Sequence, residues 1–74
     1  MKMKMFSIVD EDGIYGIPFT QVNEKLASVA VTNYCKKLPF MKVDLMELGD
    51  FDTKSGVISF FGPIKLDYKQ IYSE

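Results

Sequence analysis

The sequence contains no histidine, no arginine and no tryptophan, and it has a single cysteine, Cys35, among its 74 residues. Without histidine the chain lacks the commonest general base and the commonest metal ligand of proteins. Neither a Ser/His nor a Cys/His pair is available, and no Gly-rich phosphate loop is present. A lone cysteine excludes an internal disulfide and is typical of a reducing compartment. We therefore expect no enzyme activity, no metal and no cofactor.

The lack of arginine also narrows the nucleic-acid partners. Nine lysines oppose ten acidic residues, which gives a formal net charge of −1. Arginine makes bidentate contacts to guanine and phosphate that lysine, a point charge, does not reproduce. Sequence-specific reading of duplex DNA is therefore disfavoured. Binding of single-stranded DNA through clustered lysines and aromatic stacking stays open.

Long apolar runs are absent as well. No run approaches the ~20 residues of a bilayer-spanning helix, and the start of the chain has no apolar core of a signal peptide. We expect a cytosolic protein with no membrane partner. The 47% hydrophobic and 14% aromatic composition predicts one folded domain over residues 1–74, which at this size is marginally stable alone.

Alternating apolar residues predict a strand over 3–9, and Asp12-Gly13 then favours a turn. A second strand is expected over 14–19, where Pro18 places it at an edge or ends it. The next segment predicts the one helix, over about 23–37. Asn23 is its expected N-cap, apolar residues recur at helical spacing, and Pro39 follows its end.

The second half of the chain predicts a hairpin of strands 43–51 and 57–61 around a loop that contains Gly56. A further strand from Ile64 to about Tyr68 fits the alternation, and residues 69–74 are expected to fray. The fold class is thus α+β. A small antiparallel sheet, in the order β-β-α-β-β with an extra C-terminal strand, packs on one helix.

Both faces of this hairpin are apolar. Strict alternation puts Val43, Leu45 and Phe51 on one face. Because one helix covers one face of a sheet, the other face needs a partner, and we expect a homodimer. The predicted interface residues on that second face are Met46, Leu48, Ile58 and Phe60.

Lysines cluster near the start of the chain, at the end of the predicted helix and shortly after it, and an aromatic residue lies close in sequence to some of them. These are the candidate contacts to a nucleic-acid strand: Lys2, Lys4, Phe6, Lys36, Lys37, Phe40 and Lys42. The lysines would contact phosphates, and Phe6 and Phe40 would stack on bases. The ordinary alternative for the lysines is solubility and, at the helix C-terminus, interaction with the helix dipole.

Three blocks of the sequence occur together, in order, in a known family. They are Met5-Phe6-Ser7-Ile8-Val9-Asp10, then Pro18-Phe19, then Glu47-Leu48-Gly49-Asp50-Phe51-Asp52 followed by Thr53 and Gly56. This pattern resembles the small nonstructural proteins of gokushovirus-type microviruses, which are phages with single-stranded DNA genomes. The tail departs from the family pattern, because Leu66 leads into Asp67 rather than glycine. Within the third block, Gly49 would permit a bulge or a close backbone approach.

The resemblance implies a DNA-binding or packaging protein in the cytosol of a host bacterium, one that shifts replication toward single strands for the capsid. The leading hypothesis is therefore a non-enzymatic phage protein that binds single-stranded DNA or the viral replication and packaging proteins. The rival hypothesis is a homo-oligomeric adaptor that contacts host or viral proteins and binds no nucleic acid; the acidic balance of charges favours this rival.

Overall fold

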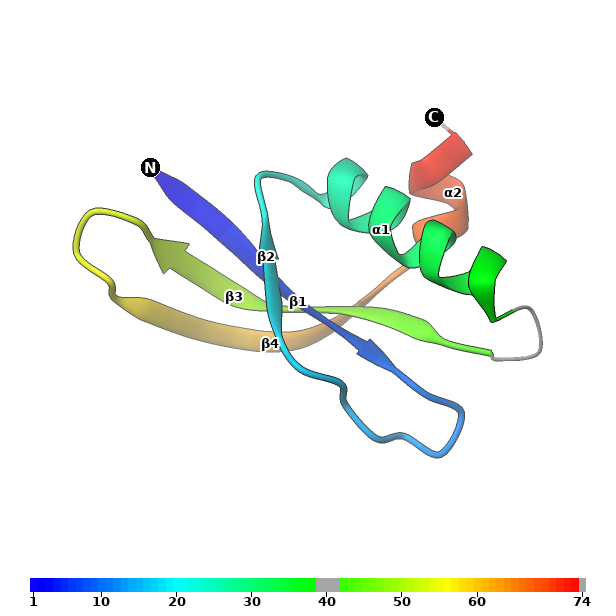
Figure 1. Ribbon diagram of the computed structural model, residues 1–74. Coiled ribbons are helices and arrows are strands. Elements are labelled where there is room, and N and C mark those ends of the chain that lie inside the picture. Colours follow the sequence, from blue (N-terminus) through cyan, green and yellow to red (C-terminus); the bar gives the residue numbers. More distant parts are fainter. Residues whose placement is uncertain (39–41, 74) are drawn as a thin grey trace.

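The structure is a computed structural model that describes residues 1–38 and 42–73. Its elements, in chain order, are β1 (Lys2–Val9), β2 (Phe19–Gln21), α1 (Glu24–Lys37), β3 (Asp44–Asp52), β4 (Ile58–Leu66) and α2 (Tyr68–Ser73). The strands form one antiparallel sheet in the spatial order β2-β1-β3-β4 (Figure 1). The predicted α+β class and the order β-β-α-β-β are confirmed, and a second helix follows them.

Helix α1 begins and ends where its sequence signals predict. The backbone N–H of Leu26 donates to the Asn23 side-chain oxygen at 2.9 Å, which caps the first turn. Lys36 and Lys37 occupy the last turn, where positive charge interacts favourably with the helix dipole. The predicted helix of about 23–37 therefore agrees with the structure to within one residue.

The core lies between α1 and the sheet. Its fully or almost fully buried apolar residues are Phe6, Ala27, Val31, Val43 and Leu45. Phe6 and Phe19 pack with their ring centroids 5.9 Å apart, which joins β1 to the edge strand β2. This small cluster is where α1 packs on the sheet.

The second strand is shorter and later than predicted. Instead of 14–19, β2 covers Phe19–Gln21, and the preceding residues form a loop with one isolated bridge between Val9 and Tyr15. In this loop the N–H of Gly16 donates to the Ile8 carbonyl at 2.9 Å, and the Ser7 hydroxyl donates to the Gly16 carbonyl at 2.9 Å. Pro18 lacks an N–H for the ladder, so regular pairing resumes only after it.

Strand β4 is longer than predicted and absorbs the expected C-terminal strand. It continues from Ile58 through Gly62 and Pro63, whose peptide bond is cis, to Leu66. Because β4 is the edge of the sheet, a residue without an N–H can lie within it. The predicted end of the hairpin at residue 61 is therefore wrong.

The tail forms helix α2 rather than a strand and a frayed end. Its first turn is capped by Asp67, whose carboxylate accepts from the N–H of Gln70 at 3.2 Å. At the other end the Lys25 ammonium donates to the carbonyls of Ile71 and Tyr72, at 3.0 and 2.7 Å. These contacts fasten α2 to α1. Neither of the helices described here has the length and apolar character to cross a bilayer.

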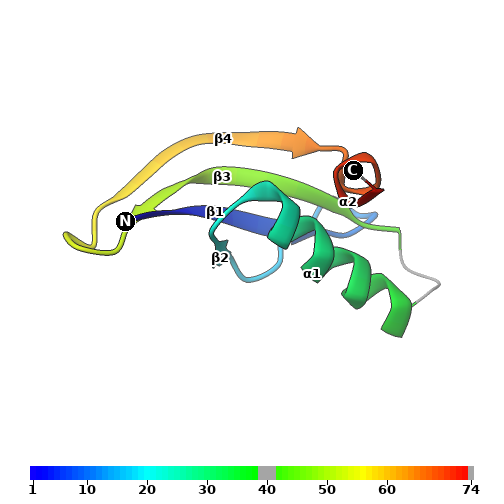
Figure 2. The same cartoon turned by 90° about the horizontal axis from the view of Figure 1, so that it is seen from above.

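The two helices leave much of the sheet uncovered. Both lie on the same side of the sheet and over the same end of it, while the turn between β3 and β4 projects at the other end (Figures 1 and 2). Neither helix of the described residues lies on the opposite side of the sheet. We call this opposite side the open face.

Candidate functional site

A bulge in β3 decides which side chains lie on the open face. Met5 pairs with Gly49 and Phe6 pairs with Glu47, so Leu48 is an extra residue on β3. The pairing with β4 is also irregular between Glu47 and Gly49. Gly49 is required here, because a Cβ at this position would collide with the backbone carbonyl of Ser59. The close approach expected for Gly49 is therefore confirmed.

The bulge reverses the alternation of the residues that follow it. Cross-strand partners share a face of a sheet, and Phe51 pairs with Met3 on one side and with Ile58 on the other. Gly49 likewise pairs with Met5 and Phe60. Phe51 therefore lies on the open face, and the prediction that it shares a face with Val43 and Leu45 is wrong. Strict alternation fails wherever one strand has an extra residue.

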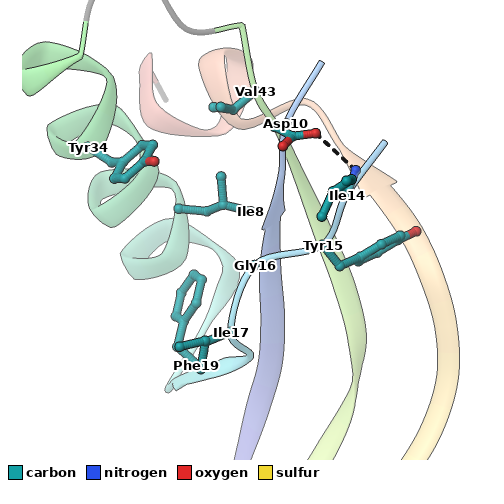
Figure 3. A pocket seen from close by; sticks show the side chains of 9 residues that line it. All are labelled: Ile8, Asp10, Ile14, Tyr15, Gly16, Ile17, Phe19, Tyr34 and Val43. Carbon is teal, nitrogen blue, oxygen red and sulfur yellow. Dashed lines mark hydrogen bonds between the residues drawn. The ribbon is translucent and has the colours of Figure 1, made fainter. Parts of the chain in front are cut away.

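The open face is consequently broad and apolar. Val9 pairs with Tyr15, which brings a tyrosine from the β1–β2 loop onto the same side, pointing away from α1 (Figure 3). The large side chains that the register assigns to the open face are Met3, Met5, Tyr15, Met46, Phe51, Ile58 and Phe60. At one end of this face the Lys65 ammonium lies 3.6 Å from the Asp44 carboxylate.

The four residues predicted as an oligomer interface lie on or next to this face. Met46 is half-buried, as is Leu48 in the bulge. Ile58 and Phe60 are exposed, with 72% of Phe60 accessible to solvent. The monomer therefore does not enclose these side chains with its own chain.

The structure does not gather the predicted nucleic-acid contacts into one surface. Lys2 begins β1, whereas Lys36 and Lys37 end α1. Phe6 is fully buried in the core, so the prediction that its ring stacks on bases is wrong. Its position between β2 and β3 explains the burial, because both neighbouring strands and α1 pack around it. Phe40 lies outside the described residues.

Lys4 and Lys42 have acidic neighbours. The Lys4 ammonium lies 3.7 Å from the carboxylates of both Glu24 and Glu47. Lys42 lines a hollow that also contains Asp10, Glu11 and Asp44. Neighbouring carboxylates oppose the approach of a phosphate. Neither lysine therefore offers the open positive surface that was predicted.

Glu47 is the one strongly buried acid of the described residues. Only 5% of it is exposed, on the helix side of the sheet. Burial raises the pKa of the Glu47 carboxyl above its ordinary value, a hydrogen bond with Glu24 raises it further, and the Lys4 charge lowers it. The cluster joins the start of α1 to β1 and β3. Its geometry is that of a structural contact under the helix rather than an accessible reaction centre.

A hollow of about 340 Å³ lies between α1 and the β1–β2 loop (Figure 3). Its walls are mostly apolar, with Ile8, Ile17, Phe19 and Tyr34 among them. The one carboxylate, of Asp10, accepts from the N–H groups of residues 12 and 14 at 3.0 and 2.9 Å and so holds the turn. That carboxylate is occupied by loop structure and provides no acid–base pair in the hollow.

Two further features concern chemistry. Within residues 1–38 and 42–73, no group of three or more His, Cys, Asp or Glu side chains is placed to hold a metal ion. Cys35 is half-buried against the core, with its sulfur 3.9 Å from the Tyr68 hydroxyl. Burial, followed by the contact with Cys35, raises the pKa of Tyr68. Cys35 thus packs as the small apolar residue that its place on the helix predicts.

Sequence reasoning missed two contributors to the open face, Tyr15 and Phe51. Phe51 could have been placed by treating Gly49 as a bulge, since an isolated glycine within a strand pattern signals one. Tyr15 depends on how the β1–β2 loop folds back, for which the sequence carries no such signal. Comparisons with protein-family models, with curated proteins and with solved structures found no match to this chain.

Proposed function

We propose that this protein is a non-enzymatic, self-associating adaptor whose working surface is the open face, and that the face docks on a second copy of the chain. One observation carries the proposal. Both helices lie on one side of the sheet and over one end of it (Figures 1 and 2), while the other side presents apolar side chains in neighbouring cross-strand pairs, with Phe60 72% exposed at its margin. Large exposed apolar patches of this kind mark interaction sites.

The dimensions of the chain favour a second copy. A compact 8.5 kDa monomer is expected to expose about 4,650 Å², whereas this one exposes 5026 Å². Its radius of gyration is 12.2 Å, against about 11.3 Å expected for this length. A typical stable interface covers about 800 Å² per partner. A flat molecule with so small a core gains most from covering its widest apolar side.

The chemistry of the open face also suits an isologous contact, in which the same patch lies on both partners. Methionine and aromatic residues are enriched in interface cores, and methionine adapts its shape to irregular neighbours. The face offers three methionines, Met3, Met5 and Met46. Lys65 and Asp44 supply one charge of each sign at its end, so a two-fold arrangement can pair unlike charges.

Analytical ultracentrifugation at micromolar concentration tests the proposal. The wild-type protein is expected to sediment as an oligomer, because burial of the open face stabilises it. Met46→Lys should dissociate that contact by adding a positive charge to the face beside Lys65, its cross-strand neighbour. The matched control is Ile17→Lys, at a site that is 91% exposed and away from the open face. A folded wild-type monomer of about 8.5 kDa would overturn the proposal.

A second candidate function is binding of single-stranded DNA, which the resemblance to microvirus nonstructural proteins implies. One observation favours it, at a hollow that contains Lys36 but none of the other predicted contacts. A hollow between α1 and α2 is lined by Lys36, Lys69, Tyr68 and Tyr72, with no acidic residue among its described lining. Lysines beside an exposed aromatic ring are the combination that single-strand binding uses, and Tyr72 is such a ring here, whereas Tyr68 is half-buried.

Fluorescence anisotropy with a labelled oligonucleotide tests this second candidate. Three phosphate contacts, from Lys36, Lys37 and Lys69, predict a log–log salt slope of about −2 for a single strand. Lys36→Gln together with Lys69→Gln should abolish most of that slope, whereas Lys54→Gln in the distant β3–β4 turn should not. If adding the protein at 50 mM salt does not change the anisotropy of the oligonucleotide, the DNA-binding candidate is excluded and the adaptor function is the one that stands.

A further inference from the structure

The outer edge of β4 is a second uncovered feature. All residues of β4 before Leu66 are exposed, and among residues 1–38 and 42–73 the strand pairs with β3 alone. An edge strand presents unpaired N–H and C=O groups along its free side. Proteins usually protect such an edge with proline, lysine, a bulge or a very short strand. The opposite edge, β2, is protected in this way, since it has three residues and follows Pro18.

The backbone hydrogen bonds show which groups of β4 point outward. The N–H of Asp52 donates to the Val57 carbonyl at 2.9 Å, so the backbone of Val57 is directed toward β3. In an antiparallel ladder the direction alternates along the strand. The N–H and C=O groups of Ile58 and Phe60 therefore point away from the sheet. Pro63 has no N–H, and this limits regular strand addition to the first half of β4.

We propose that this first half of β4 pairs with β4 of a second copy, antiparallel, with Ile58 opposite the partner's Phe60 and Ser59 opposite the partner's Ser59. The inference rests on the proposed self-association and adds a second, different contact to it. In this register the outward-pointing N–H and C=O groups of Ile58 and Phe60 in each copy hydrogen-bond to those of Phe60 and Ile58 in the other copy. The proline falls outside the paired stretch.

The register also agrees with the faces of the sheet. Ile58 and Phe60 lie on the open face, so pairing them across the edge joins the open faces of two copies into one larger apolar surface. The two-fold axis of this edge contact runs along the sheet normal, while the axis of a face-to-face contact runs parallel to the sheet. In the proposed assembly these two perpendicular axes intersect, and intersecting two-fold axes generate a closed tetramer, whereas axes that miss each other would generate an open fibre. The assembly expected is two eight-stranded sheets packed face to face.

Disulfide trapping tests the register directly. The N–H and C=O groups of Ser59 point to β3, so Ser59 and the partner's Ser59 would form a non-hydrogen-bonded pair. The Cα atoms of such a pair are about 4.5 Å apart, which is within the range of a disulfide. In a Cys35→Ala background, Ser59→Cys should form a cross-linked dimer under mild oxidation. Ser73→Cys, at a serine on α2 that is also exposed, is the matched control and should stay uncross-linked. Equal cross-linking of both variants would overturn the proposed register.

Sedimentation separates this inference from the function it rests on. The wild type should reach about 34 kDa, four times the chain mass of 8.5 kDa. Ser59→Lys places like charges opposite each other at the edge, so it should break the edge contact and halve the mass. Met46→Lys should break the open-face contact and also halve the mass. The double variant should be monomeric. A wild-type dimer that Ser59→Cys does not trap overturns the edge contact alone. A wild-type dimer that Ser59→Cys does trap, and whose mass Met46→Lys leaves unchanged, overturns the open-face contact alone. A wild-type monomer overturns both contacts.

Discussion

Phe60→Ala gives the sharpest quantitative test of the open face. A phenylalanine side chain covers about 200 Å², so the 72% exposed fraction of Phe60 leaves roughly 140 Å² available for burial. At about 25 cal/mol per Å², and allowing for the area that alanine keeps, the substitution removes about 2 kcal/mol per copy. A two-fold contact loses this twice, about 4 kcal/mol, which is a ~10³-fold increase in Kd.

The assay is sedimentation equilibrium in a Ser59→Lys background, which removes the edge contact and leaves one dimer to measure. Phe61→Ala is the matched control, because alternation places Phe61 on the opposite side of the same strand, where it is 49% exposed. It should change Kd by less than about tenfold, since it loses no area in the face contact. Thermal unfolding of the monomer should shift little for either variant. Equal weakening by both substitutions would refute the assignment of the contact to the open face.

Three further predictions concern the fold. Gly49→Ala should lower Tm more than Gly56→Ala. A Cβ at Gly49 meets the Ser59 backbone, which should cost roughly 1–3 kcal/mol of unfolding free energy, whereas Gly56 has open space around it and only a positive φ of 75°. Equal losses of Tm in a thermal melt would contradict the bulge geometry. The raised pKa of Glu47 gives stability that is fully present below the unfolded pKa and is lost as pH rises through the folded pKa. Glu47→Gln should therefore flatten that fall and raise stability at pH 7, as urea titrations across pH 4–7 would show, and an unaltered slope would count against it. Lys25→Met should speed amide exchange within α2 while changing Tm little, because it removes the donor to the α2 carbonyls; unchanged exchange would mean that other contacts fasten this helix.

The strongest local signals predicted the fold class and the elements around the core. Asn23, the apolar spacing of α1 and the two lysines of its last turn fix the helix by contacts within a few residues, and such contacts can be inferred from the chain alone. The hairpin of β3 and β4 was likewise visible from its alternation and from Gly56.

Other features depend on contacts between distant residues. The position of β2 follows from how Gly16 bonds to Ile8, and α2 is held by Lys25, which is more than 40 residues away in sequence. Phe6 looked like a surface ring beside Lys4, but its strand is flanked by two others in the sheet, so the ring is enclosed. Burial depends on which strands become neighbours, and spacing in one strand does not contain that information.

Because Leu48 is an extra residue, the side chains of β3 alternate in one sense before it and in the opposite sense after it. Upstream of it, odd-numbered side chains such as Leu45 and Glu47 face the helices; downstream, Asp50 takes that side and Phe51 the other. Deletion of Leu48 would therefore close the bulge without turning over any neighbouring side chain, because Glu47, Gly49, Asp50 and Phe51 already alternate once that residue is left out. Loss of this codon should be tolerated better than loss of a codon from a regularly paired part of the same strand, where the downstream side chains would exchange faces.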